Sequence, residues 1–154
     1  MQGLESTHVG ELAYAVWIKA APDQVWRVYV DPNRVPEWQT GRPVIGDVHG
    51  GPGELGSTYV SRRGRLVART VVLASDIPTR LVTRTDAYLG LELEVTSRLV
   101  ARAGGTDLEL TVETHWRSRS RLIQKVVERA ILSRREARKE LTKLKAVIER
   151  EAGD

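Results

Sequence analysis

The apolar residues in the last quarter of the chain recur every three or four positions. Residues 118–152 contain no Gly or Pro, and this spacing places their apolar side chains along one side of a helix. The pattern therefore predicts one long helix, with an apolar stripe that needs a partner surface. The stripe consists of Ile123, Val127, Ala130, Ala137, Leu141, Leu144 and Ile148, with Leu122, Val126 and Ile131 beside it.

The stripe is interrupted near its middle. Arg134 occupies a position where the period expects an apolar residue, and Ser133 followed by Glu136 matches a capping box. These two features favour a bend or break near Ser133 as much as they favour a continuous helix.

The middle of the chain has the alternating pattern of β-strands. Consecutive alternating segments joined by short turns at residues 77–79 and 104–105 predict an antiparallel meander with one dry and one wet face. The dry face is the expected partner of the long helix. The expected strands cover residues 11–19, 43–48, 57–62, 65–74, 80–87, 89–101 and 106–117.

Two short helices are expected between the first two strands. Pro22 suits the first turn of a helix and Asp23 favours its N-terminus, which predicts a helix to about Val30. Asp31 and Pro32 repeat this device, so a second helix should end near residue 36.

The expected dry face mixes apolar residues with small and hydroxyl-bearing ones. Such a face suits a cavity better than a tightly packed core, because a ligand pocket is mostly apolar with a few polar groups. These interrupting residues are Ala68, Thr70, Thr83, Thr85, Ser97 and Thr114. The acidic residues of the same strands fall on the wet face, where cross-strand pairing with Arg69, Arg84 or Arg98 explains them. Those acidic residues are Glu92, Glu94, Glu109 and Glu113.

Length and composition narrow the class of protein. A chain of 154 residues with 41% apolar and 29% charged residues predicts one globular domain over residues 1–154. No apolar run approaches the roughly 20 residues of a membrane span, and no secretory signal is visible. Cysteine is absent, which excludes disulfides, thiol catalysis and Cys-based zinc sites. A cytoplasmic location fits these features.

The net charge of +4 is concentrated in the expected helix. Residues 119–151 carry eleven Lys or Arg against five Glu. This basic surface is either a solvated helix face or a contact for an anionic membrane surface or RNA. No aromatic residue follows Trp116, which argues against single-stranded nucleic acid. No DNA partner is expected, and both a monomer and a homodimer remain open.

Motifs for cofactor chemistry lack the context they need. Gly51, Gly53 and Gly56 have the spacing of a dinucleotide fingerprint, but a strand is expected after them instead of the required helix N-terminus. The three His residues are far apart and match no metal motif, and no Gly-x-Ser-x-Gly elbow is present. The sequence therefore indicates no cofactor and no metal, and it identifies no catalytic residue.

The order strand, two short helices, six strands and long helix resembles a known superfamily. The residues that carry the resemblance are the segment from Ile18 through Ala20, Ala21, Pro22 and Val25 to Trp26, then Asp31-Pro32, Pro36-Glu37-Trp38, Gly104-Gly105-Thr106, and Leu141, Leu144 and Lys145. The chain resembles the polyketide cyclase/dehydrase-like branch of the START-like (SRPBCC) superfamily. This resemblance implies an α+β helix-grip fold, a seven-stranded curved antiparallel sheet around the C-terminal helix, with a cavity between them.

The resemblance implies binding of a small, mostly apolar molecule such as a lipid, an isoprenoid or a polyketide. A cyclase or dehydratase, and an interaction protein that uses the basic helix face, are the alternatives. The candidate cavity residues combine apolar side chains with hydroxyl and indole donors. They are Tyr29, Trp38, Tyr59, Thr83, Tyr88, Leu93, Ser97, Leu110, Thr114, Trp116, Val127 and Ile131.

Overall fold

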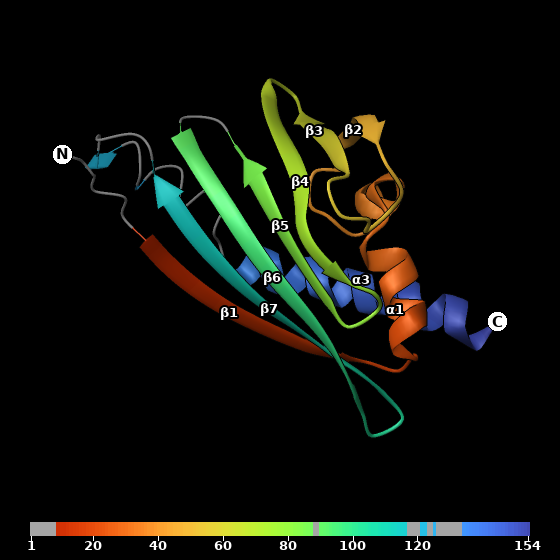
Figure 1. The fold of residues 1–154 in the computed structure, drawn as a ribbon. Helices are drawn as coiled ribbons and strands as arrows, with labels where there is room; N and C mark the ends of the chain where they lie inside the picture. Colours follow the sequence, from red (N-terminus) through yellow and green to blue (C-terminus); the bar gives the residue numbers. More distant parts are fainter. Residues whose placement is uncertain (1–8, 88–89, 117–120, 123–124, 126–133) are drawn as a thin grey trace.

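Seven strands and a long C-terminal helix dominate the computed structural model (Figure 1). The structure describes residues 9–87, 90–116, 121–122, 125 and 134–154. The elements follow one another in the order that the sequence predicts: a strand, two short helices, six strands and a helix.

The first strand, β1 (Val9–Ile18), leads into two short helices, and both start as predicted. Helix α1 (Pro22–Tyr29) begins with Pro22, and the side chain of Gln24 accepts a hydrogen bond of 3.0 Å from the backbone N–H of Ala21. The 3-10 helix η1 (Pro32–Glu37) begins after Asp31, whose side chain accepts a hydrogen bond of 3.0 Å from the backbone N–H of Asn33. These contacts satisfy N–H groups that a helix start leaves open.

The remaining strands complete one antiparallel sheet in the spatial order β1-β7-β6-β5-β4-β3-β2. Every strand from β2 to β7 pairs with its sequence neighbour. Strand β1 pairs with β7 and forms the edge of the sheet opposite β2. The predicted meander is therefore confirmed. The bounds are β2 (Val44–His49), β3 (Thr58–Arg63), β4 (Leu66–Asp76), β5 (Arg80–Asp86), β6 (Leu91–Arg102) and β7 (Gly105–Trp116).

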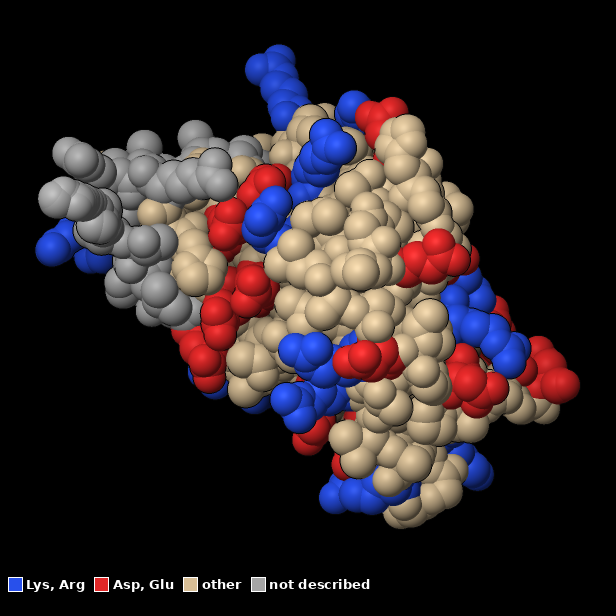
Figure 2. All heavy atoms as spheres, in the orientation of Figure 1, with Lys and Arg blue, Asp and Glu red and all other residues tan. Residues whose placement is uncertain are grey.

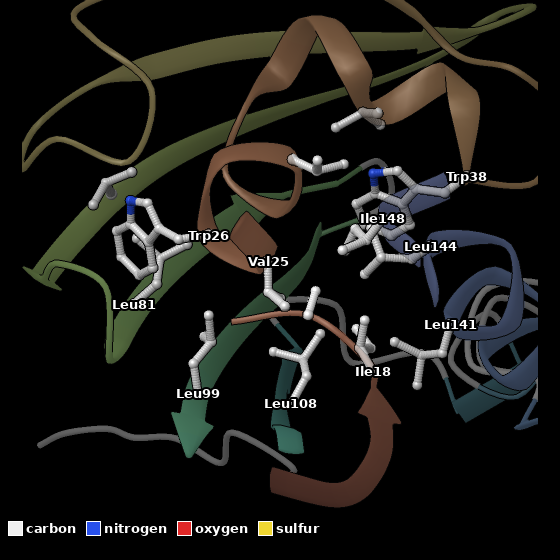
Figure 3. Packing of buried hydrophobic residues seen from close by; sticks show 14 residues of the cluster. Ile18, Val25, Trp26, Trp38, Leu81, Leu99, Leu108, Leu141, Leu144 and Ile148 are labelled. Carbon is white, nitrogen blue, oxygen red and sulfur yellow. The ribbon is translucent and has the colours of Figure 1, made fainter. Parts of the chain in front are cut away.

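Helix α3 (Arg134–Gly153) runs along the inner face of the curved sheet, with α1 near its C-terminal part (Figure 1). Leu141, Leu144 and Ile148 from the predicted stripe are buried. They share one core cluster with Ile18 of β1 and Leu108 of β7, and Figure 3 shows these side chains pointing toward one another between helix and sheet. The helix is thus gripped through its apolar stripe.

The expected start of the long helix, between Ser118 and Ser133, lies outside the described residues except for Arg121, Leu122 and Lys125, and so does the bend expected near Ser133. Leu122, which the sequence places beside the stripe and not in it, is 74% exposed. It precedes Ile123 by one residue, which rotates it by about 100° around a helix. In the described parts of the chain, no helix has the length and apolarity to cross a membrane.

The C-terminal end of α3 is tied by its carboxylates to η1 and to the segment that precedes α1. Arg34 of η1 donates from Nε to Glu37 at 2.7 Å and from Nη1 to Glu151 of α3 at 2.9 Å. Glu149 of α3 accepts a hydrogen bond of 2.8 Å from the backbone N–H of Lys19. These contacts fix the position of the helix relative to α1 and η1.

Candidate functional site

The concave face of the sheet brings together residues that are far apart in sequence. One lateral row crosses five strands, because each member lies opposite the next in the strand register. It consists of Tyr59, Thr70, Thr85, Leu93 and Thr114. Four of these five carry a hydroxyl group, so a polar band crosses the otherwise apolar inner wall.

Two of these hydroxyls bond to each other across neighbouring strands. Thr70 Oγ1 and Thr85 Oγ1 are 2.7 Å apart. Burial raises the pKa of the Tyr59 hydroxyl above its ordinary value of 10.0, and a hydrogen bond with Thr70 partly opposes the rise. Tyr59 is therefore a neutral hydroxyl, able to donate, over the physiological pH range.

A second polar pair links α1 to the middle of the sheet. Tyr29 Oη and Ser97 Oγ are 2.7 Å apart, and Ser97 is 1% exposed. Burial raises the pKa of Tyr29 to about 12, although the hydrogen bond with Ser97 partly opposes the rise. This pair connects the short helix to the inner face of β6.

Trp38, at the exit of η1, completes this group. Its ring centroid lies 5.9 Å from that of Tyr29 with a tilt of 30° between the planes, a favourable aromatic arrangement. Trp38 is 8% exposed and belongs to the same core cluster as Leu144 and Ile148 (Figure 3). Its Nε1 is buried, and among the described residues it has no hydrogen-bond partner.

The centre of the concave face is not filled by the described core. Two separate apolar clusters cover its ends: the large one against α3, and a small one around Leu91 and Trp116. Val95 of β6 and Val112 of β7 lie opposite each other between these ends and belong to neither cluster. Both are partly buried and keep part of their surface accessible, so among the described residues this part of the wall is not packed in a core cluster.

Most of the predicted cavity residues lie on or against this wall. Tyr29 bonds to the wall through Ser97, Trp38 packs against Tyr29, and Trp116 lies at the far end, 3% exposed. The members of the strands are Tyr59, Thr83, Leu93, Ser97, Leu110 and Thr114. Tyr88, Val127 and Ile131 lie outside the described residues.

The alternation along the strands places Val95 and Val112 on the dry face, as the structure does, but the candidate cavity residues did not include them. Both alternate with named candidates, Val95 between Leu93 and Ser97 and Val112 between Leu110 and Thr114. The period of two along each strand is the signal that places them on this wall.

The outer face of the sheet carries the charges, as predicted. Glu94 lies opposite Arg84, and Glu109 lies opposite Arg98. Arg69, in contrast, lies opposite Asp86. Figure 2 views this face and shows acidic and basic side chains interspersed over the strands. Glu92 lies 3.9 Å from Arg84 and Glu113 lies 3.7 Å from His115. The outward position of these carboxylates explains them as surface groups and removes them from the candidate site.

The glycine-rich segment before β3 is a turn that packs on α1. Gly53 has a φ of +72°, and a Cβ at this position would lie 3.0 to 3.1 Å from atoms of Val30 and Trp26. Strand β3 follows, so no helix N-terminus is present to receive a pyrophosphate. The close approach to α1 explains the glycine.

A curved antiparallel sheet that closes around a C-terminal helix, with two short helices at one end, defines the helix-grip class. The family model described as polyketide cyclase/dehydrase and lipid transport matches residues 10–149. The chain belongs to this family. No curated protein matches the chain.

Solved structures share the fold at low sequence identity. A protein of unknown function from Staphylococcus aureus has a TM-score of 0.73 at 13% identity, covering 96% of this chain and 98% of its own. Truncated norcoclaurine synthase from Thalictrum flavum has a TM-score of 0.70 at 15% identity, with coverage of 96% and 98%. A protein from Mesorhizobium loti has a TM-score of 0.68 at 17% identity, with coverage of 92% and 98%. These similarities establish the fold.

Proposed function

We propose that the chain, as one domain over residues 1–154, binds a small, mostly apolar molecule between the concave face of the sheet and its C-terminal helix. The observation that carries the proposal is the partly accessible wall at Val95 and Val112, which belongs to neither of the two clusters that the described residues form. Apolar side chains at the centre of an inner face are ordinarily covered, because their burial drives folding. A ligand is the occupant that we propose for this part of the wall.

Affinity would come mainly from removing apolar surface from water. An occupant that buries about 300 Å² of apolar surface gains roughly 7 kcal/mol at 25 cal/mol per Å². Association costs reduce this gain, so we expect dissociation constants in the micromolar range or weaker for a simple probe.

Trp38 indicates one polar feature of the ligand. An indole N–H can only donate a hydrogen bond, and leaving it buried without a partner costs about 1–3 kcal/mol. An acceptor on the ligand, such as a carbonyl or ether oxygen, would satisfy Nε1. We therefore infer a ligand that is apolar over most of its surface and carries an acceptor near Trp38.

A catalytic function has less support than binding. A cyclase or dehydratase must move a proton, which requires a suitably placed acid or base. Along β1 and β4 to β7, the described residues of the concave face include no charged side chain and no His. Tyr29 and Tyr59 hold their protons because burial raises their pKa values. Both are suited to orienting a ligand as hydroxyl donors.

A pair of probes tests this proposal. Fluorenone and fluorene have nearly the same shape, but only fluorenone has a carbonyl acceptor. We expect both to quench tryptophan fluorescence on binding, with fluorenone about five-fold tighter, which corresponds to about 1 kcal/mol for one hydrogen bond. The variant Trp38→Phe should abolish this difference. In Trp17→Phe, which removes an indole that instead donates to the carbonyl of Arg102 at 2.9 Å, the difference should remain.

A larger side chain in the proposed space tests where the probe binds. Val95→Trp places a large side chain in the proposed space, whereas Thr96→Trp changes the next residue, which points to the outer face. We expect Val95→Trp to abolish binding of both probes without loss of stability, and Thr96→Trp to bind as the native chain does. If Val95→Trp costs about 1–3 kcal/mol, as overpacking of a filled core does, the wall is closed and the proposal is wrong.

A further inference from the structure

Acidic and basic residues of α3 point in different directions. All four of its Glu side chains are engaged with the rest of the fold or with a neighbouring Lys. On the side near η1, the backbone N–H of Thr40 donates to Glu140 at 2.9 Å and its hydroxyl donates to Glu136 at 3.1 Å. Glu149 and Glu151 accept hydrogen bonds from Lys19 and Arg34, and these contacts hold the pKa of both carboxyls below its usual range. The Glu side chains of α3 therefore make contacts within the fold.

The basic residues of α3 that are exposed form the opposite surface. They are Arg134, Arg135, Arg138, Lys139, Lys143 and Arg150. Lys139 lies 3.7 Å from Glu136; the other five make no ion pair with any described residue. Among the described residues of α3, the charge that is exposed on this side is therefore mainly positive.

Four of these cations lie around one shallow, open depression on the helix surface. Arg135, Arg138, Lys139 and Lys143, together with Thr142, line a space of about 570 Å³. Their spacing of three and four residues places them in one stripe, which we call the basic stripe. Like charges at this spacing repel one another and destabilise a helix. An anionic partner would relieve that repulsion.

We propose that the basic stripe of α3 docks the protein onto an anionic lipid surface. Lys and Arg near such a surface each contribute about five-fold in binding, which corresponds to about 1 kcal/mol per charge. A lipid surface fits better than nucleic acid, because α3 contains no aromatic residue on which a base could stack. The apolar face of α3 stays buried in the core, so the contact is electrostatic and does not require the helix to insert.

Vesicle sedimentation tests the docking. The native chain should bind vesicles of phosphatidylcholine with about 30% phosphatidylserine and should not bind phosphatidylcholine alone. The double variant Arg138→Gln/Lys143→Gln should bind the anionic vesicles about 25-fold more weakly, because it loses two charges. The control Arg65→Gln/Arg69→Gln removes two exposed cations at and next to strand β4, and it should change binding less than two-fold. Raising salt from about 0.1 M to about 0.5 M should release the native chain.

The proposal is overturned if the native chain binds neutral and anionic vesicles equally, binds neither, or loses binding equally in both double variants. Tighter binding to poly(U) RNA than to the anionic vesicles, lost in Arg138→Gln/Lys143→Gln, would assign the stripe to RNA instead. Both substitutions are at exposed positions, and matching thermal melts check that the variants are folded. Fluorenone binding by the same variants should be unchanged, which separates docking from ligand binding.

Discussion

The grip of the sheet on α3 makes a prediction about Leu144. Its side chain is 0% exposed and lies in the cluster that joins α3 to β1, β6, β7 and the short helices. Replacing Leu by Ala at such a site removes buried carbon atoms and leaves a cavity, which costs about 2–5 kcal/mol. Ala favours a helix slightly more than Leu does, which offsets only a few tenths of this loss. We therefore expect Leu144→Ala to lower the free energy of unfolding by about 3 kcal/mol.

Urea unfolding followed by tryptophan fluorescence measures this loss, because Trp38 belongs to the same cluster. The midpoint should fall at an unchanged slope, and the melting temperature should drop by roughly 6–12 °C. The neighbouring exposed position supplies the control, since Lys143→Ala should change stability by less than about 0.5 kcal/mol. A loss below about 1 kcal/mol for Leu144→Ala, or a loss equal to that of the control, would refute the gripped helix.

Three further predictions follow from specific contacts. Gly53→Ala should destabilise the fold more than Gly64→Ala in thermal melts: both have positive φ, but only Gly53 would bring a Cβ against Trp26 and Val30. Arg34 lowers the pKa values of Glu37 and Glu151. The contribution of these two carboxylates to stability is therefore present above the usual carboxyl pKa of 4.5 and is lost as the pH falls below it. Arg34→Met should show a smaller loss of melting temperature on acidification, and a pH profile identical to that of the native chain would contradict this. Burial raises the pKa of Tyr29, so absorbance titration at alkaline pH should show one tyrosine that ionises near pH 12. This ionisation should be absent in Tyr29→Phe. The contribution of Tyr29 to stability is present below pH 10 and is lost as the pH rises toward 12.

The order of helices and strands could be predicted from the sequence, because short-range residue patterns determine it. Alternation along β6 and β7 separated the buried Leu99 and Leu108 from the outward Arg98 and Glu109, as the structure confirms. Pro22 and Pro32 marked the two helix starts. The same alternation predicted most of the residues on the concave wall, because a strand has only two faces.

Contacts between segments that are distant in sequence could not be predicted from such patterns. The bond between Tyr29 and Ser97 joins residues 68 positions apart, and its formation depends on how α1 lies over β6. The engagement of Glu149 with Lys19 spans 130 positions. The sequence shows that α3 is basic, but only these tertiary contacts show that its carboxylates face the fold. The segregation that carries the docking proposal could therefore not be predicted from charge counts.

Native mass spectrometry of the protein as purified tests the central claim most directly. The account predicts a bound molecule of a few hundred daltons on the native chain, or uptake of fluorenone where the chain is purified empty. Neither should occur in Val95→Trp, and both should persist in Thr96→Trp. A chain that shows only its own mass, takes up no fluorenone and loses stability on Val95→Trp would contradict the account, because its concave face would then be a filled core.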